Sequence, residues 1–216
     1  MTIQKKDSQM SLWNIDSSDS KKSGRQLMME DGDVVFHERF FGENESNRFY
    51  QELYSTTRWR QDEIKIYGKK LPLPRLTAWY GDEGKAYTYS KIQMLAEAWT
   101  SPMLAIKSRI EIAAGVRFNS VLLNLYRDGR DSMSWHSDDE HELGINPVIG
   151  SVSFGESRRF IFKHKIKTNL PKVEVELSNG SLLIMQGRTQ HFWVHQVPRT
   201  AKPIDPRINL TFRIIH

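Results

Sequence analysis

The chain has 216 residues, no cysteine and a formal net charge of +5 at pH 7. The absence of cysteine excludes disulfides, thiolate metal ligands and a cysteine nucleophile. The first residues lack the apolar segment of a secretory signal, and no apolar run reaches about 18 residues, so neither export nor a membrane span is expected. The positive charge permits a polyanionic partner. We expect a monomer in the cytoplasm or nucleoid of a bacterium, or in the nucleus of a eukaryote.

Residues 1–33 are rich in Ser, Asp, Lys and Gly and show no hydrophobic periodicity, which predicts a disordered tail. Within this tail, residues 9–13 (QMSLW) are similar to the Gln-x-x-Leu-aromatic peptide that docks onto bacterial sliding clamps. Gln9, Leu12 and Trp13 are therefore candidate clamp contacts. Five loosely defined positions also match by chance, so an ordinary polar tail is the alternative.

Residues 34–216 are expected to form one domain. In its first half, residues 42–56 carry apolar side chains at helical spacing, which predicts a helix. Residues 94–113 predict a second helix, or a pair of helices broken near Pro102.

The second half of the chain predicts short strands separated by turns. The expected strands are residues 118–126, 148–155, 158–167, 173–177, 181–185, 191–197 and 207–215. Seven such strands favour a sandwich, barrel or jelly roll, with the helices packed outside the sheet. The mouth of a double-sheet barrel is wide enough to hold a metal ion and a small ligand.

One acidic stretch in this basic chain contains a candidate pair of metal ligands. His136 and Asp138 are two residues apart, so in an extended segment their side chains point the same way. A ferrous oxygenase needs two imidazoles and one carboxylate on one face of the metal. The alternative is a solvated acidic loop, because His-x-Asp also occurs by chance.

The third ligand would come from far along the chain. His191 and His195 share strand parity, and the residues alone do not separate them. His141 has the wrong parity for a shared face, and His164 lies among lysines, where a surface or sheet-face histidine is the simpler interpretation.

The last predicted strand alternates strictly between apolar and polar residues. Its polar face consists of Arg207, Asn209, Thr211 and Arg213. This face either points to water, as in most half-exposed strands, or points into the barrel. In the second case the guanidiniums suit the two ends of a small dicarboxylate. Asn124 and Tyr126, on one face of an earlier strand, are polar side chains of the kind that fix a ligand.

Together these residues resemble the AlkB family of Fe(II)- and 2-oxoglutarate-dependent dioxygenases, over about residues 58–215. The resemblance rests on His136-x-Asp138, His195, Asn124-x-Tyr126 and the RINLTFR ending at 207–213. It implies a mainly β fold with flanking helices and a double-stranded β-helix (jelly-roll) core. It implies iron ligation by His136, Asp138 and His195, which favours His195 over His191. The implied 2-oxoglutarate contacts are Asn124, Leu125, Tyr126, Arg207, Asn209 and Arg213, with O2 as the other co-substrate.

The family acts on alkylated DNA, RNA or protein, so the substrate needs a separate argument. Two basic clusters favour nucleic acid, since cationic stripes follow phosphates. The first holds Arg58, Arg60, Lys65, Lys69, Lys70 and Arg75, and the second holds Arg158, Arg159, Lys163, Lys165, Lys167 and Lys172. A merely solubilising surface is the alternative. We therefore expect oxidative demethylation of 1-methyladenine and 3-methylcytosine in DNA, with formaldehyde, succinate and CO2 as products.

Chemistry on a base atom requires the base to leave its stack. A short apolar finger in a hairpin would fill the gap, and aromatic residues would hold the flipped base. The candidate substrate contacts are Tyr67, Gly68 and Lys69 in the finger, Arg75, the aromatic stretch Tyr87, Thr88 and Tyr89, and the acids Asp139 and Glu140. Either acid would accept an N–H of a cationic methylated base. Trp79 is a further candidate wall, with core packing as its alternative. The same chemistry on RNA or protein, and a non-catalytic nucleic-acid-binding jelly roll, are the other hypotheses.

Overall fold

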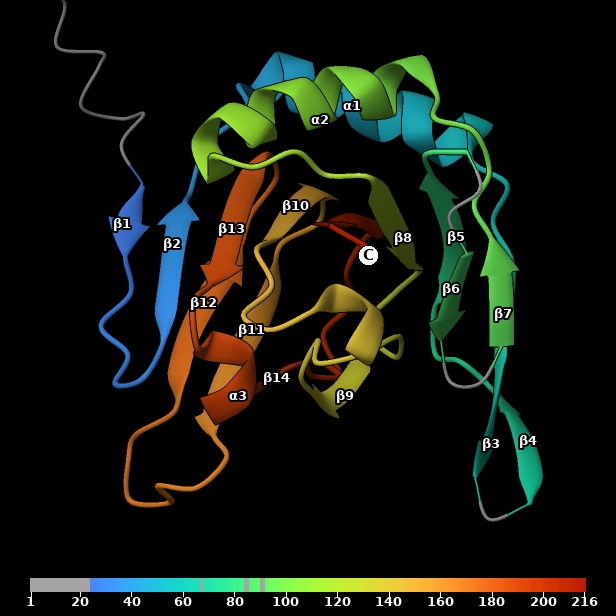
Figure 1. The fold of residues 1–216 in the computed structure, drawn as a ribbon. Coiled ribbons are helices and arrows are strands. Elements are labelled where there is room, and N and C mark those ends of the chain that lie inside the picture. Colours follow the sequence, from blue (N-terminus) through green and yellow to red (C-terminus); the bar gives the residue numbers. More distant parts are fainter. Residues whose placement is uncertain (1–23, 67, 84–85, 90–91) are drawn as a thin grey trace, which may run out of the picture.

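The computed structural model describes residues 24–66, 68–83, 86–89 and 92–216, and two facing antiparallel sheets form its centre (Figure 1). The larger sheet has the strand order β1-β2-β13-β10-β15-β8-β5. Its strands are β1 (Arg25–Gln26), β2 (Asp33–His37), β13 (Ser181–Gln186), β10 (Ile149–Gly155), β15 (Arg207–Arg213), β8 (Ser120–Tyr126) and β5 (Leu76–Gly81).

The smaller sheet has the order β12-β11-β14-β9. Its strands are β12 (Val173–Leu177), β11 (Arg158–His164), β14 (Trp193–Val197) and β9 (Met133–His136). Two separate hairpins lie beside the larger sheet, formed by β3 (Glu63–Ile66) with β4 (Lys69–Pro72) and by β6 (Ala86–Tyr89) with β7 (Ile92–Leu95) (Figure 1). The mainly β architecture predicted from the sequence is confirmed, with a jelly-roll core.

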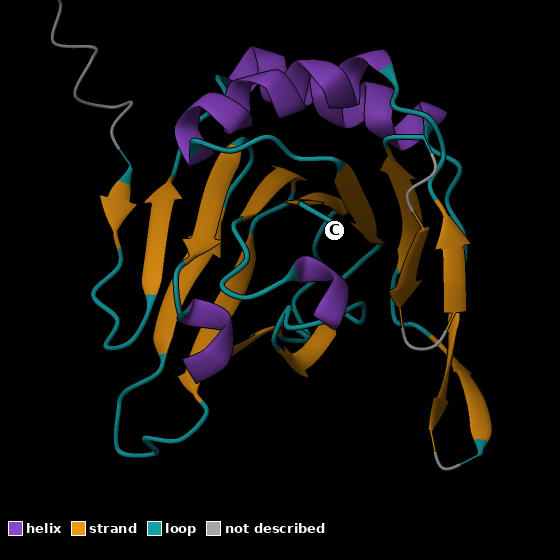
Figure 2. Ribbon diagram, viewed as in Figure 1, coloured by secondary structure: helices purple, strands orange, loops and turns teal. Residues whose placement is uncertain are grey.

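Two helices, α1 (Glu43–Thr56) and α2 (Ser101–Ala114), cover the outer face of the larger sheet (Figure 2). Apolar side chains of both helices join one buried cluster with that face of the sheet. Its members include Phe49, Leu53, Met103, Ile106, Ile110, Leu123, Leu210 and Phe212. The other face of the sheet packs on the smaller sheet, so its central strands are buried on both faces. This double burial orients β15, because its apolar residues face the helices and its polar residues face inward.

The predicted helix at 42–56 is confirmed, and the strands predicted after residue 116 occur where they were expected, with shifts at their ends. The prediction of one helix or a helix pair at residues 94–113 is wrong about where the helix begins. Residues 92–95 form β7, and α2 begins only at Ser101, with Pro102 in its first turn. Proline is favoured there because its missing N–H has no helical partner to lose. Sequence reasoning also missed β2 and β5.

The N-terminal boundary differs from the expected tail of residues 1–33. Arg25 and Gln26 pair with Phe36 and Val35 of β2, and Leu27 is buried in the core. The segment 25–33 is therefore part of the fold. The QMSLW stretch lies outside the described residues. No helix in the described part of the chain is long and apolar enough to cross a membrane.

Candidate active site

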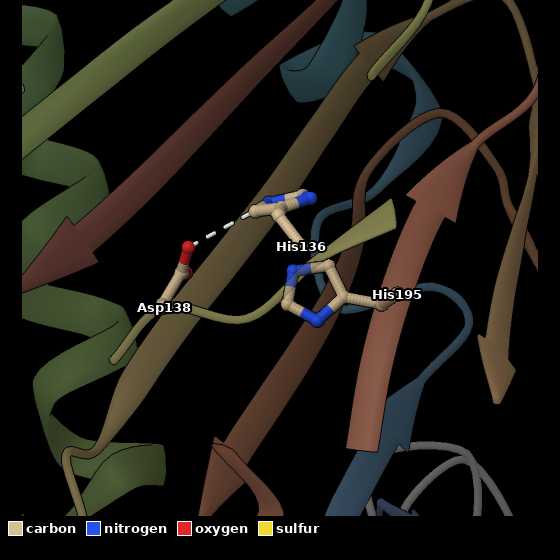
Figure 3. A group of neighbouring side chains, drawn as sticks. All are labelled: His136, Asp138 and His195. Atoms are coloured by element: carbon tan, nitrogen blue, oxygen red, sulfur yellow. Dashed lines mark ion pairs between the residues drawn. The ribbon is translucent and has the colours of Figure 1, made fainter. Parts of the chain in front are cut away.

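His136, Asp138 and His195 converge between the two sheets. His136 ends β9, Asp138 lies in the loop that follows, and His195 is directly opposite His136 on β14. The ligand atoms of the three side chains all lie within 4.8 Å of one another. Figure 3 shows the two imidazoles side by side, with the carboxylate of Asp138 reaching toward His136. Two imidazoles and one carboxylate are the donor set that ferrous oxygenases use.

The histidine rings are fixed by their surroundings. Nδ1 of His136 lies 2.9 Å from the carbonyl of Ser134, and Nε2 of the same ring lies 3.6 Å from Oδ1 of Asp138. His195 is buried and stacks on Phe160, with the ring centres 5.0 Å apart. Burial, with a contribution from His136, lowers the pKa of His195 to about 3. Its imidazole is therefore neutral at physiological pH, and the neutral ring is the form that binds a metal.

Asp138 is held as a carboxylate from two sides. Its backbone N–H donates a 2.9 Å hydrogen bond to Oε1 of Gln190, and Nη2 of Arg213 lies 3.0 Å from its Oδ1. Burial acts to raise the pKa of Asp138, but Arg213 and then the two histidines lower it to about 2. The side chain is thus charged and oriented without a metal. Nδ1 of His195 is buried and has no hydrogen-bond partner among the described residues, so the site fits a cation that neutral imidazoles can bind.

A cavity adjoins the three ligands. It is lined by Leu122, Asn124, Tyr126, Met133, His136, Asp138, Ser151, Phe160, Met185, His195, Val197, Arg207, Asn209, Thr211 and Arg213. Five of the six residues predicted to hold 2-oxoglutarate line it. The exception is Leu125, whose buried side chain belongs to the core under the helices. Only its backbone is on the ladder with β15, so its side chain makes no cavity contact.

Arg207 brings an uncompensated positive charge to this cavity. Its Nη2 donates to Oγ of Ser153 at 2.9 Å, while Nε and Nη1 have no hydrogen-bond partner among the described residues. Burial is the main reason that the pKa of Arg207 falls to about 10. Asn209 is fixed by Ser151 and by the Val152 carbonyl, at 2.9 and 3.0 Å. Donors without acceptors in a buried cavity fit an anion such as a carboxylate.

Arg75 is not at the surface, contrary to the predicted substrate contact. It is buried, and its Nε donates a 2.8 Å hydrogen bond to Oδ1 of Asn124. Arg75 directly precedes β5 and does not line the cavity, whereas its partner Asn124 does. Trp79 is likewise a core residue, packed with Leu122 and Leu143.

The predicted finger is a hairpin, as expected, with Gly68 at its turn in the left-handed region at φ 79° and Lys69 exposed on β4. Tyr67 lies outside the described residues. Tyr87, Thr88 and Tyr89 form strand β6, and the structure describes only their backbone.

The two candidate base-reading acids differ in their surroundings. Asp139 is mostly exposed and accepts hydrogen bonds from Ser137 Oγ at 2.7 Å and from Lys165 Nζ at 3.2 Å. Glu140 is partly buried, and its Oε2 is a buried acceptor without a hydrogen-bond partner among the described residues. Of the two acids, Glu140 is therefore the one with a buried carboxylate oxygen that has no partner in the described chain.

Three of the six residues in the second basic cluster are paired with acids from other segments. Arg159 pairs with Glu174, Lys165 with Asp139, and Lys167 with Glu30 and Asp31. Arg158 is buried. Lys163 and Lys172 form no ion pair within the described chain, and they lie 5.0 and 5.7 Å from the ring centre of Trp135. The predicted stripe is thus reduced to two cations beside one aromatic ring.

The remaining histidines lie outside the ligand cluster. His191 belongs to the short helix α3 (Thr189–Phe192) and contacts Asn146 Oδ1 at 2.9 Å, so the expected shared strand parity with His195 is wrong. His164 ends β11 and is buried, so the sheet-face expectation holds and the surface expectation does not, and its Nδ1 accepts backbone N–H groups of Ile166 and Lys167.

Sequence reasoning missed Gln190, which fixes the Asp138 backbone, and Phe160, which stacks on His195. A buried glutamine directly before the predicted strand 191–197 carries no local signal, because its partner is 52 residues away.

Comparisons with known proteins agree with this geometry. The model of the family described as the 2OG-Fe(II) oxygenase superfamily matches residues 33–213. Mouse "Alpha-ketoglutarate-dependent dioxygenase alkB homolog 3" is 40% identical over 191 residues, which cover 85% of this chain and 66% of that protein. Mouse "DNA oxidative demethylase ALKBH2" is 34% identical over 208 residues, covering 92% of this chain and 87% of that protein.

The chain spans 62–66% of the length of the first alkB homolog 3 relatives. Among solved structures, OsALKBH1 superposes with a TM-score of 0.60 at 14% identity, covering 88% of this chain and all of that one. At this identity the likeness shows the fold alone.

Proposed function

This chain belongs to the 2OG-Fe(II) oxygenase superfamily and within it to the AlkB family, and from that premise we propose that it oxidatively demethylates 1-methyladenine and 3-methylcytosine in DNA. The co-substrates are 2-oxoglutarate and O2, and the products are formaldehyde, succinate and CO2. One observation carries the proposal: the cluster of His136, Asp138 and His195 opens into a cavity whose buried Arg207 has free donors. The name of one relative, the mouse DNA oxidative demethylase ALKBH2, supports DNA as the substrate.

His136, Asp138 and His195 would hold Fe(II). The bound iron supplies the oxidising chemistry that hydroxylates the methyl group, with 2-oxoglutarate as the source of two electrons. The protein supplies position and charge. Arg213 keeps Asp138 ionised and Gln190 holds its backbone.

The co-substrate would lie along the polar face of β15. Arg207 with Tyr126 suits the carboxylate far from the metal, and Asn209 and Arg213 lie on the same face toward Asp138. Asn124, held by Arg75, faces Asn209 across the β8–β15 ladder. Paired hydrogen bonds from guanidinium groups distinguish a dicarboxylate from a simple 2-oxo acid.

For the substrate, a methylated adenine or cytosine carries a positive charge and an exocyclic N–H. The Oε2 of Glu140, two residues past Asp138, has no hydrogen-bond partner among the described residues, which supports this carboxylate as the acceptor of such a donor. Asp139 is the weaker candidate, because Lys165 and Ser137 already occupy its carboxylate. The hairpin at Gly68 and Lys69 supports insertion into a base stack.

Lys163 and Lys172 support contact with the phosphate backbone. Their ammonium groups lack a carboxylate partner in the described chain, and both lie over the ring of Trp135, an aromatic side chain of the kind that stacks on bases. We therefore propose that these two lysines contact DNA phosphates, and that this contribution to the affinity decreases as the salt concentration rises. An enzyme with this substrate works where DNA is, in the nucleoid or the nucleus.

The test is one panel of reactions with iron, 2-oxoglutarate and methylated oligonucleotides in single-stranded DNA, duplex DNA and RNA, with formaldehyde as the readout. We expect release from DNA and none with His136→Ala. Release only from RNA, or only from a methylated peptide, would move the same chemistry to another substrate. No turnover of 2-oxoglutarate under any condition would favour a non-catalytic nucleic-acid-binding jelly roll.

Two further proposals concern association. The chain is proposed to act as a monomer, which size-exclusion chromatography with light scattering tests. Residues 9–13 are proposed to contact a sliding clamp through Gln9, Leu12 and Trp13. A double Leu12→Ala, Trp13→Ala variant should lose clamp pull-down and keep full activity on free oligonucleotides.

A further inference from the structure

A second buried arginine lies behind the cavity wall, next to Tyr126. Arg158 is the first residue of β11 and is 4% exposed. Its guanidinium carbon lies 5.5 Å from the Tyr126 ring centre, and that of Arg207 lies 5.2 Å from the same centre. Arg207 and Tyr126 line the cavity, whereas Arg158 does not. One aromatic ring thus lies between the cavity and a second cation.

The contacts of Arg158 are all to uncharged oxygen atoms. Its Nη2 donates to the carbonyls of Asp131 at 2.8 Å and Pro198 at 2.7 Å, and Nη1 donates to the Asp128 carbonyl at 3.4 Å. The two carboxylates of this loop are engaged elsewhere. Asp131 binds Arg127 and Asp128 binds Arg130. Within the described chain, neither Arg158 nor Arg207 forms an ion pair.

Two buried guanidiniums without a partner carboxylate are unfavourable, because a buried charge needs a counter-charge. The pKa values of both guanidinium groups are lowered by this burial. Burial lowers the pKa of Arg158, although Tyr126, Asp131 and Asp128 act to raise it. Burial, with repulsion from Arg158, lowers the pKa of Arg207, although Tyr126 acts to raise it. This end of the barrel therefore carries a positive potential that an anion in the cavity would relieve.

We propose that Arg158 is a positioning residue that makes the cavity select a dicarboxylate co-substrate, acting through Tyr126 and beside Arg207. The proposal rests on 2-oxoglutarate being the ligand of the cavity. The charge of Arg158 adds to the attraction for the carboxylate far from the metal. Its hydrogen bonds hold the loop after β8, which is a separate, structural contribution. The two contributions can be separated because a lysine keeps the charge and a glutamine does not.

The experiment is isothermal titration calorimetry of the Mn(II)-loaded protein with two ligands. One is 2-oxoglutarate, and the other is 2-oxopentanoate, which has the same chain length and lacks the far carboxylate. The proteins are the wild type, Arg158→Gln, Arg158→Lys and the control Arg159→Gln. Arg159 is the adjacent residue, exposed and already paired with Glu174. Thermal denaturation of each variant reports the structural contribution separately.

We expect Arg158→Gln to weaken 2-oxoglutarate about tenfold, as one charge interacting at moderate distance predicts, and to leave 2-oxopentanoate within about twofold. Arg158→Lys should keep the preference for 2-oxoglutarate, and Arg159→Gln should behave as the wild type. Equal weakening of both ligands, or no weakening of either, overturns the proposal. If Arg158→Gln does not fold, Arg158→Lys decides alone, since loss of the preference in a protein that keeps the charge contradicts it. A wild type that binds neither ligand contradicts the proposed function instead.

Discussion

Arg75 and Asn124 form a buried pair in which Nε of the arginine donates a 2.8 Å hydrogen bond to Oδ1 of the asparagine. The asparagine is a wall residue of the cavity, and the arginine is behind it. With Oδ1 engaged, the amide Nδ2 is left to face the cavity contents. A residue that adds nothing to the surface charge thereby orients a ligand contact.

Arg75→Met should therefore weaken binding of 2-oxoglutarate and leave the affinity for DNA unchanged. Loss of one hydrogen bond to a charged group predicts about 1.5–3 kcal/mol, which is roughly 10- to 150-fold. Calorimetric titration of the Mn(II)-loaded protein measures the first quantity, and fluorescence anisotropy with labelled DNA measures the second. Arg60→Met, at an exposed position of the same basic cluster, is the control for co-substrate binding. If Arg75→Met lowers the affinity for DNA and binds the co-substrate normally, Arg75 is a substrate contact and this prediction is wrong.

Binding of a divalent metal should stabilise the protein through His195 and not through His191. Mn(II) at 100 times its Kd is expected to add about 2.7 kcal/mol, which for a chain of this size raises Tm by roughly 5–11 °C. Differential scanning calorimetry with and without the metal should show this increase in the wild type and in His191→Gln. The increase should be absent in His195→Gln. Equal responses of the two variants would contradict the ligand assignment.

Gln190→Leu should weaken metal binding without touching the metal. It removes the acceptor for the Asp138 N–H and leaves that group buried and unpaired. Loss of a residue that orients a ligand typically lowers metal affinity about 10- to 100-fold. Competition with a fluorescent chelator measures the affinity. The matched control is Gln186→Leu, whose amide contacts Asp33 instead. Equal loss in both variants would mean that the defect is general.

Lys163→Ala combined with Lys172→Ala should lower the affinity for DNA and its dependence on salt. Two phosphate contacts correspond to a decrease of about 1.8 in the slope of log K against log[salt] for duplex DNA. Anisotropy titrations between about 50 and 200 mM salt give the slope. Arg159→Ala is the control, because its charge is already paired. An unchanged slope in the double variant would exclude this surface from the DNA interface.

Much of the site is predictable because its residues are fixed by local geometry. His136 and Asp138 are two apart, and the polar residues of β15 alternate along one strand, so parity alone groups them. His195 was separable from His191 only through family resemblance, since residues 189–192 form a helical turn that strand parity does not foresee. The structure supplies that distinction directly.

The remaining differences come from partners that are far apart in sequence. Lys165 and Lys167 belong to a run without acids, yet Asp139, Glu30 and Asp31 reach them in space. Arg75 looks like one more surface cation until Asn124 is placed beside it. Charge patterns along the chain therefore overstate the basic surface, because they omit the acids that tertiary folding delivers.

The placement of β9 has a consequence for how the site assembles. β9 is an edge strand of the smaller sheet, and among the described strands it pairs only with β14. Its register with β14 shifts between His195 and Val197. His195 thus belongs to an inner strand, whereas His136 and Asp138 are on or beside an edge. A metal bound by all three residues would link the edge strand β9 and the loop after it to the inner strand β14. Amide hydrogen exchange in residues 133–140 should slow when the metal binds, while exchange in β14 changes little.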